Sequence, residues 1–225
     1  MHIEPGLVEG GKLWLGYTTA AALGGYTVKS AWDAVKARGP LSPAARSILA
    51  TALVFSFFEI LPHYPVGVSE VHLILGSTLF LILGAAPTAI GLMLGLLIQG
   101  LFFAPFDLPQ YGMNVTTLLA PLFALRYVAG KVISAGTAYV DLRYAQALAL
   151  SATYQAGIVA WVAFWAFFGQ GVAGETLTAV GSFGGAYLLV IAIEPLIDLA
   201  VLAGAKTLRS LAGSGLVDRR LFNAA

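Results

Sequence analysis

The chain has 225 residues, of which 59% are hydrophobic and only 10% are charged, and its formal net charge at pH 7 is +1. Soluble domains carry about 25% charged residues, so these few charges cannot cover the surface of a soluble domain of this size. The composition therefore excludes a soluble globular enzyme, a nucleic-acid-binding protein and a disordered chain, and it predicts an all-α membrane protein.

Apolar runs follow one another along the whole chain and predict a bundle of about seven transmembrane helices in a single domain, residues 1–225. The runs approach the ~20 residues that a helix needs to cross the hydrocarbon core. Pro87 is expected to break the pattern between the third and fourth runs and to divide them into a hairpin of two helices. The runs cover residues 13–28, 48–61, 71–86, 89–104, 114–125 (continuing less cleanly towards 133), 145–168 and 177–205.

Lys and Arg concentrate in three of the segments around these runs, which predicts the orientation of the chain. Cytoplasmic loops are enriched in both residue types. With seven spans and an outer N-terminus, eleven of the twelve basic residues fall on the cytoplasmic side, and only Lys12 does not. The eleven are Lys29, Lys36, Arg38, Arg46, Arg126, Lys131, Arg143, Lys206, Arg209, Arg219 and Arg220. We therefore expect the N-terminus outside and the C-terminus in the cytoplasm.

Glycine patterns predict two helix-packing surfaces. One is the GxxxG pair Gly91 and Gly95, and the other is formed by Gly181, Gly184 and Gly185. The chain has no cysteine, which excludes disulfides and thiolate metal sites. It also lacks a GxxxxGK[ST] motif, so it cannot hydrolyse ATP by a P-loop.

The first two residues can form a metal chelate. The opening MHIEPGLVEGGK lacks the positive charge of a signal peptide, so we expect Met1 to remain the terminus. The Met1 amine, the His2 amide nitrogen and a His2 imidazole nitrogen then lie in one plane, and His72 or His63 can supply a fourth nitrogen. This donor set suits Ni²⁺, Cu²⁺ or low-spin Co²⁺. In the alternative interpretation, His2 is solvated and His72 only begins a helix.

Three segments carry a resemblance to a known family. The opening MHIEPG resembles the start of the cobalt/nickel-binding membrane subunits (CbiM/NikM family) of energy-coupling factor (ECF) transporters. The stretch VGVSEVHL, residues 66–73, resembles their loop in which Gly, Ser and a metal-ligating His precede an apolar helix. GMNV, residues 112–115, is similar to their Gly-x-Asn-x stretch, and Glu194 resembles a recurrent acidic position. The family's Ser-Gly-His is one residue longer here, between Ser69 and His72, and His63 has no clear counterpart.

The resemblance implies the substrate-capture subunit of an ABC-type importer rather than an enzyme. Co²⁺ or Ni²⁺ is the transported ion and not a permanently bound cofactor. The expected metal ligands are Met1, His2 and His72, with His63 as a further candidate, and the expected supporting residues are Asn114, Ser69, Glu70 and Glu59. Glu70 is expected to act as an oxygen ligand or as a negatively charged group at the entrance to the site.

The same resemblance implies partners and a location. The partners are a transmembrane coupling subunit, two ATPase subunits, in some systems a small membrane accessory subunit, and membrane lipid, but no nucleic acid. The location is the bacterial or archaeal cell (inner) membrane, which the chain crosses several times.

Acidic residues inside the apolar runs leave other interpretations open. Glu194 and Asp198 lie four residues apart on one helical face, and we expect a structural role or contact with a partner subunit. Glu59 could support the metal site or pair structurally. A proton-coupled secondary transporter, with these acids as relays, is the alternative function. A serine hydrolase is not expected, because Ser69 lacks a nucleophile-elbow context.

Overall fold

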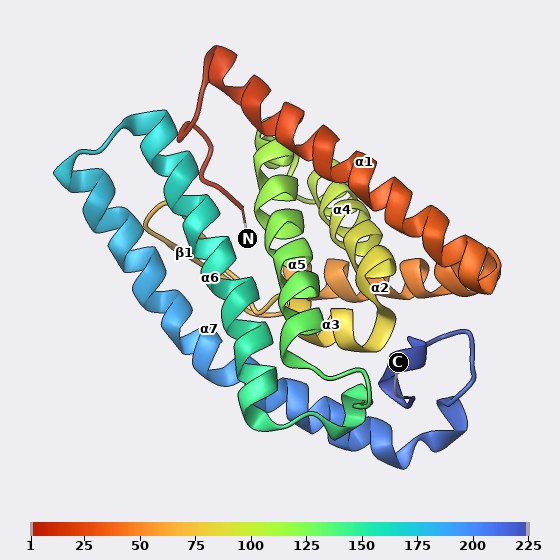
Figure 1. Cartoon of the computed structure of the whole chain (residues 1–225). Coiled ribbons are helices and arrows are strands. Elements are labelled where there is room, and N and C mark those ends of the chain that lie inside the picture. The colour runs from red at the N-terminus through yellow and green to blue at the C-terminus, as the bar shows by residue number, and fades with distance from the viewer. Residues whose placement is uncertain (1, 224–225) are drawn as a thin grey trace.

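The structure is a computed structural model that describes residues 2–223, and in this part of the chain seven α-helices form a bundle with a short β-hairpin at one side (Figure 1). The helices are α1 (Leu13–Arg38), α2 (Leu41–Glu59), α3 (Gly76–Leu83), α4 (Ala85–Phe102), α5 (Tyr111–Val132), α6 (Tyr144–Gln170) and α7 (Gly174–Thr207). The hairpin strands are β1 (Tyr64–Val66) and β2 (Ser69–Val71), which pair antiparallel. Short 3₁₀ turns cover Gly10–Lys12, Pro105–Gln110, Tyr139–Asp141, Arg209–Leu211 and Arg219–Leu221.

The outward faces of the long helices are apolar, as lipid contact requires. Five helices are long and apolar enough to cross a membrane: α2, α4, α5 with its preceding turn, α6 and α7. On α7, half or more of the surface is exposed at Leu188, Leu189, Ile193 and Leu196. Water would solvate such a continuous apolar face poorly, whereas lipid solvates it well. The prediction of an all-α membrane protein is confirmed.

The third predicted run, residues 71–86, differs from an unbroken span. Its first part completes β2 and continues as an extended segment, and only its second part forms the eight-residue helix α3. Eight residues rise about 12 Å, far less than the roughly 30 Å of a hydrocarbon core. The side chains of α3 are almost all buried, so the neighbouring helices replace lipid around this segment.

The break between α3 and α4 falls at Gly84, which corrects its assignment to Pro87. Gly84 has a φ of 85°, a region that L side chains rarely adopt. A Cβ on this residue would also lie 2.6 Å from Oδ2 of Asp218. Pro87 instead lies in the first turn of α4, where the proline nitrogen replaces no helical hydrogen bond.

Glycines bring α2 and α4 into close contact, as the GxxxG pair predicts. Gly91 packs on Ala50, and Gly95 packs on Val54. The second predicted glycine surface, on α7, is not used in this way within residues 2–223. A Cβ at Gly181 or Gly185 would meet nothing within 4 Å, and one at Gly184 would reach only Val159, at 3.5 Å.

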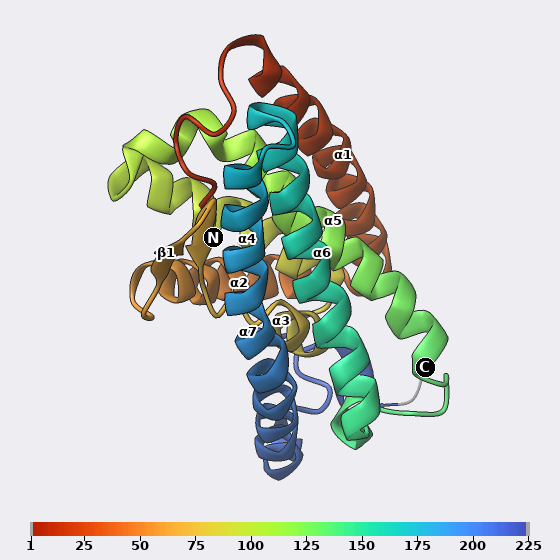
Figure 2. The same cartoon turned by 90° about the vertical axis from the view of Figure 1, so that its left-hand side faces the viewer.

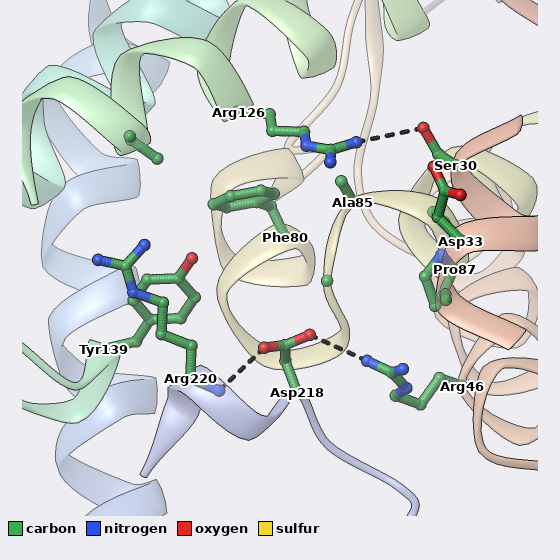
Figure 3. A pocket seen from close by; sticks show the side chains of 15 residues that line it. Ser30, Asp33, Arg46, Phe80, Ala85, Pro87, Arg126, Tyr139, Asp218 and Arg220 are labelled. Carbon is green, nitrogen blue, oxygen red and sulfur yellow. Dashed lines mark hydrogen bonds and ion pairs between the residues drawn. The ribbon is translucent and has the colours of Figure 1, made fainter. Parts of the chain in front are cut away.

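The two ends of the bundle differ in chemistry. The N-terminal segment folds back from the start of α1 and descends towards the hairpin (Figures 1 and 2). At the N-terminal ends of α2 and α4, basic residues from all three basic segments line a cavity of about 360 Å³ (Figure 3). There Arg46 pairs with Asp218, and Arg126 donates to Ser30. This clustering agrees with the predicted pattern of basic residues, and the orientation across the membrane stays a prediction.

Gly91→Ala should destabilise the bundle, because the new Cβ would lie 2.4 Å from the Cβ of Ala50 and 2.7 Å from its backbone carbon. We expect a loss of about 1–3 kcal/mol in the free energy of unfolding, measured as a lower unfolding midpoint in detergent. The matched control is Gly25→Ala on α1, where a Cβ meets nothing within 4 Å. Equal midpoints for the two variants would contradict the described packing.

Candidate metal centre

The residues after the N-terminus pair with the hairpin as a short additional strand. Ile3 forms an antiparallel bridge with Ser69. The Ser69 hydroxyl and the Glu70 N–H both donate to the carbonyl of His2, at 2.8 and 3.1 Å. These bonds fix the backbone of His2 beside Glu70. Ser69, expected to support the site, therefore contacts the backbone of His2 rather than its ring.

A second anchor comes from α5. The N–H of Ile3 donates to Oδ1 of Asn114 at 3.0 Å, and both residues are buried. A buried backbone N–H without an acceptor is costly, so this contact positions the segment as well as stabilising it. Asn114, also expected as a supporting residue, acts on the residue that follows His2.

The turn of the hairpin depends on Gly67. This residue has a φ of 64°, and a Cβ on it would lie 2.1 Å from the carbonyl oxygen of Ala179 on α7. Only glycine permits this approach. The turn therefore packs closely on α7 and holds β2 inside the bundle.

Three side chains, His2, Glu70 and His72, form a cluster whose potential ligand atoms all lie within 4.8 Å of one another. Nδ1 of His2 is 2.7 Å from Oε2 of Glu70, and Nε2 of His72 is 2.9 Å from the same oxygen. Both histidines are buried, and the carboxylate is half-buried. One carboxylate oxygen thus lies between two imidazole rings, and we call this group the His–Glu cluster.

Burial and contact set the charges of the cluster. Burial lowers the pKa of His2 and holds the pKa of His72 well below the ordinary imidazole value. Burial alone would raise the pKa of Glu70, but the contacts with His2 and His72 outweigh it and hold that pKa well below its usual range. Burial thus favours the neutral form of both imidazoles, and the contacts favour the ionised form of the carboxylate.

Sequence reasoning missed Gln99 of α4. Its Oε1 lies 2.6 Å from Nε2 of His2, and its Nε2 donates to Oε2 of Glu59 at 3.3 Å. Glu59 is therefore connected to His2 through an amide. Asp107 was also missed, although its Oδ2 lies 4.0 Å from Nε2 of His2. A single buried amide in the apolar fourth run was the available signal for Gln99.

Aromatic rings enclose the cluster on one side. Phe58 packs edge-on against the rings of His2 and His72, with centroid distances of 5.7 and 5.1 Å. The ring of His63 stacks on that of His72 at 4.8 Å and 14°. His63 is not a member of the close group, and its Nδ1 faces the carbonyl of Leu61 at 3.2 Å. The predicted ligand Met1 lies outside the described residues.

One nitrogen of the cluster has no partner among the described residues. Nδ1 of His72 is buried and makes no hydrogen bond. By contrast, Nε2 of His2, which faces away from Glu70, lies within hydrogen-bond distance of Oε1 of Gln99. A metal-binding histidine usually donates its second N–H to an acceptor, and His2 is oriented in this way.

Comparison with known proteins gives one match. A family model described as the cobalt uptake substrate-specific transmembrane region (CbiM) matches residues 2–211. Neither the curated proteins nor the solved structures contain a match to the chain.

Asn114→Ala should loosen the segment that carries His2, because it removes the acceptor of the Ile3 N–H. A lost hydrogen bond of about 1 kcal/mol corresponds to roughly fivefold faster local opening. Amide hydrogen exchange of the N-terminal peptide measures this change. Ser182→Ala, which removes only an exposed hydroxyl bonded within α7, is the control and should leave the exchange unchanged. Equal exchange in both variants would show that Asn114 does not hold the segment.

Proposed function

The chain belongs to the family of cobalt uptake substrate-specific transmembrane regions, and from this premise we propose that it is the substrate-capture subunit of an ECF-type importer for Co²⁺ or Ni²⁺. The observation that carries this proposal is the His–Glu cluster. Two neutral imidazoles and one carboxylate converge in a buried position at one end of the bundle. Imidazole nitrogen is a preferred ligand of both ions.

The ion would bind through nitrogens of Met1, His2 and His72. The Met1 amine, the His2 amide and Nδ1 of His2 complete the planar chelate, since the amide and Nδ1 close a six-membered ring. Nδ1 is also the nitrogen that faces Glu70 and, across the same oxygen, His72. An ion held by both rings therefore meets the Glu70 carboxylate, which serves as an oxygen ligand or as a counter-charge.

Gln99 favours the tautomer of His2 that the chelate requires. A neutral imidazole carries one N–H, and Oε1 of Gln99 can accept it from Nε2 of His2. Nδ1 then presents its lone pair to the ion. Glu59 accepts a hydrogen bond from the amide of Gln99 and keeps it in this orientation. We expect His63, stacked on His72, to cover the site more than to ligate.

Delivery of the ion requires other proteins. Because the chain has no P-loop, we propose that two ATPase subunits and a transmembrane coupling subunit supply the movement, with a small membrane accessory subunit in some systems. The complex would lie in the bacterial or archaeal inner membrane. The predicted outer N-terminus places the His–Glu cluster at the face from which the ion arrives.

An N-terminal extension should abolish tight metal binding, because it converts the Met1 amine into an amide. A tag at the C-terminus should leave binding unchanged, because the nearby Asp218 and Arg220 line the basic cavity at the other end of the bundle. Metal content of the two purified forms after incubation with Co²⁺ or Ni²⁺ measures the difference. Equal metal content in both forms would contradict the proposed chelate.

His72→Ala should weaken metal binding more than His63→Ala. Loss of a ligand is expected to exceed the roughly 10–100-fold effect of changing a neighbouring support, whereas loss of the stacked ring should stay within that range. Isothermal titration with Ni²⁺ gives both affinities. The reverse ranking would move the ligand assignment to His63.

A further inference from the structure

Two carboxylates lie inside the bundle, away from the His–Glu cluster. Glu194 and Asp198 of α7 are both fully buried, with 0% of their surface exposed. This burial corrects one of the roles expected for them, because neither side chain can reach a partner subunit. Bare carboxylates in an apolar interior are costly, so the surrounding groups must compensate their charge.

Polar side chains from two other helices surround the pair. Ser77 Oγ of α3 lies 3.1 Å from Oε1 of Glu194 and 2.7 Å from Oδ2 of Asp198, so it bridges the two. Thr78 donates to the other oxygen of Asp198. Ser151 and Gln155 of α6 both approach Oε2 of Glu194, the former at 3.0 Å. Among the described residues, no Lys, Arg or His forms an ion pair with either carboxylate.

The two contacts of the Ser77 hydroxyl with the carboxylate pair require more hydrogens than the hydroxyl has. A serine hydroxyl has one hydrogen, so Ser77 can donate to Glu194 or to Asp198 but not to both. If both acids are ionised, one of these two oxygen–oxygen contacts holds no hydrogen. The pair therefore needs an additional positive group, either a proton or a metal cation.

A neighbouring side-chain oxygen also lacks a hydrogen-bond donor. Oε1 of Gln155 is buried and has no hydrogen-bond partner among the described residues, while Nε2 of the same amide contacts Oε2 of Glu194. Gln155 and its neighbour Tyr154 are both fully buried. The ring of Tyr154 also packs on Gly76, next to Ser77. An unpaired buried amide oxygen, which has no hydrogen of its own, beside a carboxylate pair is independent evidence for a missing donor or cation.

We propose that Glu194, Asp198, Ser77 and Thr78 form a second cation site that takes a small divalent ion through oxygen ligands alone. Two carboxylates provide the two negative charges that balance such an ion. The bridging oxygen–oxygen distances of 2.7 and 3.1 Å match the edge of about 3.0 Å in an octahedron with metal–oxygen distances of about 2.1 Å. Octahedral oxygen sites suit Mg²⁺ and Mn²⁺.

The site is connected to the ligand loop through the chain itself. Ser77 follows His72 by five residues, and the segment between them ends at Leu75, which precedes α3 with a φ of 54°. The second site therefore lies directly after the His–Glu cluster along the chain. It differs from that cluster in its ligands, which are oxygens rather than nitrogens.

Titration with Mn²⁺, followed by electron paramagnetic resonance, tests the site in the purified full chain with its natural N-terminus. The paired variant Glu194→Gln/Asp198→Asn keeps the side-chain shapes and should remove one bound Mn²⁺ per chain. Glu175→Gln, at an exposed position on the same helix, is the matched control and should bind as the unchanged protein does. His2→Ala/His72→Ala should retain the Mn²⁺ that the acid pair holds.

Other outcomes overturn the proposal. No Mn²⁺ binding by the unchanged protein, or equal binding by the acid-pair variant, would mean that the pair carries protons only. Loss of Mn²⁺ in the histidine variant alone would assign the ion to the His–Glu cluster, which removes the second site and leaves the proposed function standing. If the paired variant fails to fold, Ser77→Ala must weaken Mn²⁺ binding by about tenfold or more.

Discussion

The hydrogen bonds between the N-terminal segment and the β-hairpin determine where the His–Glu cluster lies. His2 has no regular secondary structure of its own to hold it, yet its carbonyl accepts from both Ser69 and Glu70. The next residue is held by Asn114 of α5. The N-terminal segment is thereby placed inside the bundle, where burial lowers the pKa of His2 and the contacts with His2 and His72 lower the pKa of Glu70.

The hairpin and α3 explain how a membrane-spanning bundle can contain this much polar structure. Extended backbone is tolerated at such depth only where protein surrounds it. Here α6 and α7 supply the surroundings, through Tyr154 against Gly76 and Ala179 against Gly67. The described residues form seven helices, of which five are long and apolar enough to cross a membrane, and α3 serves as an internal support. The buried polar groups contact one another within an apolar core, and the exposed faces of the long helices are apolar as well.

The fold class and the centre of the candidate site could be predicted from the sequence, because both depend on local patterns. Apolar runs identify the long helices, and the opening residues with the histidine loop point to His2 and His72, which the structure brings together. The two-residue spacing of Glu70 and His72 places both on one face of a strand, but the apolar run concealed the strand. Gln99 and the bridging position of Ser77 depend on contacts between distant helices, which no spacing in the sequence reveals. The division at Gly84 was missed because Pro87 is the more conspicuous residue.

Leu75 is the only non-glycine residue with a positive φ in the described part of the chain. A leucine in this conformation carries a torsional strain of about 1–2 kcal/mol, which persists only while the structure on both sides enforces it. Relaxation to an ordinary backbone conformation would rotate His72 relative to Ser77. Any displacement of the histidine loop must therefore be accommodated by α3. Leu75 thus couples the position of the His–Glu cluster to the position of the proposed second cation site.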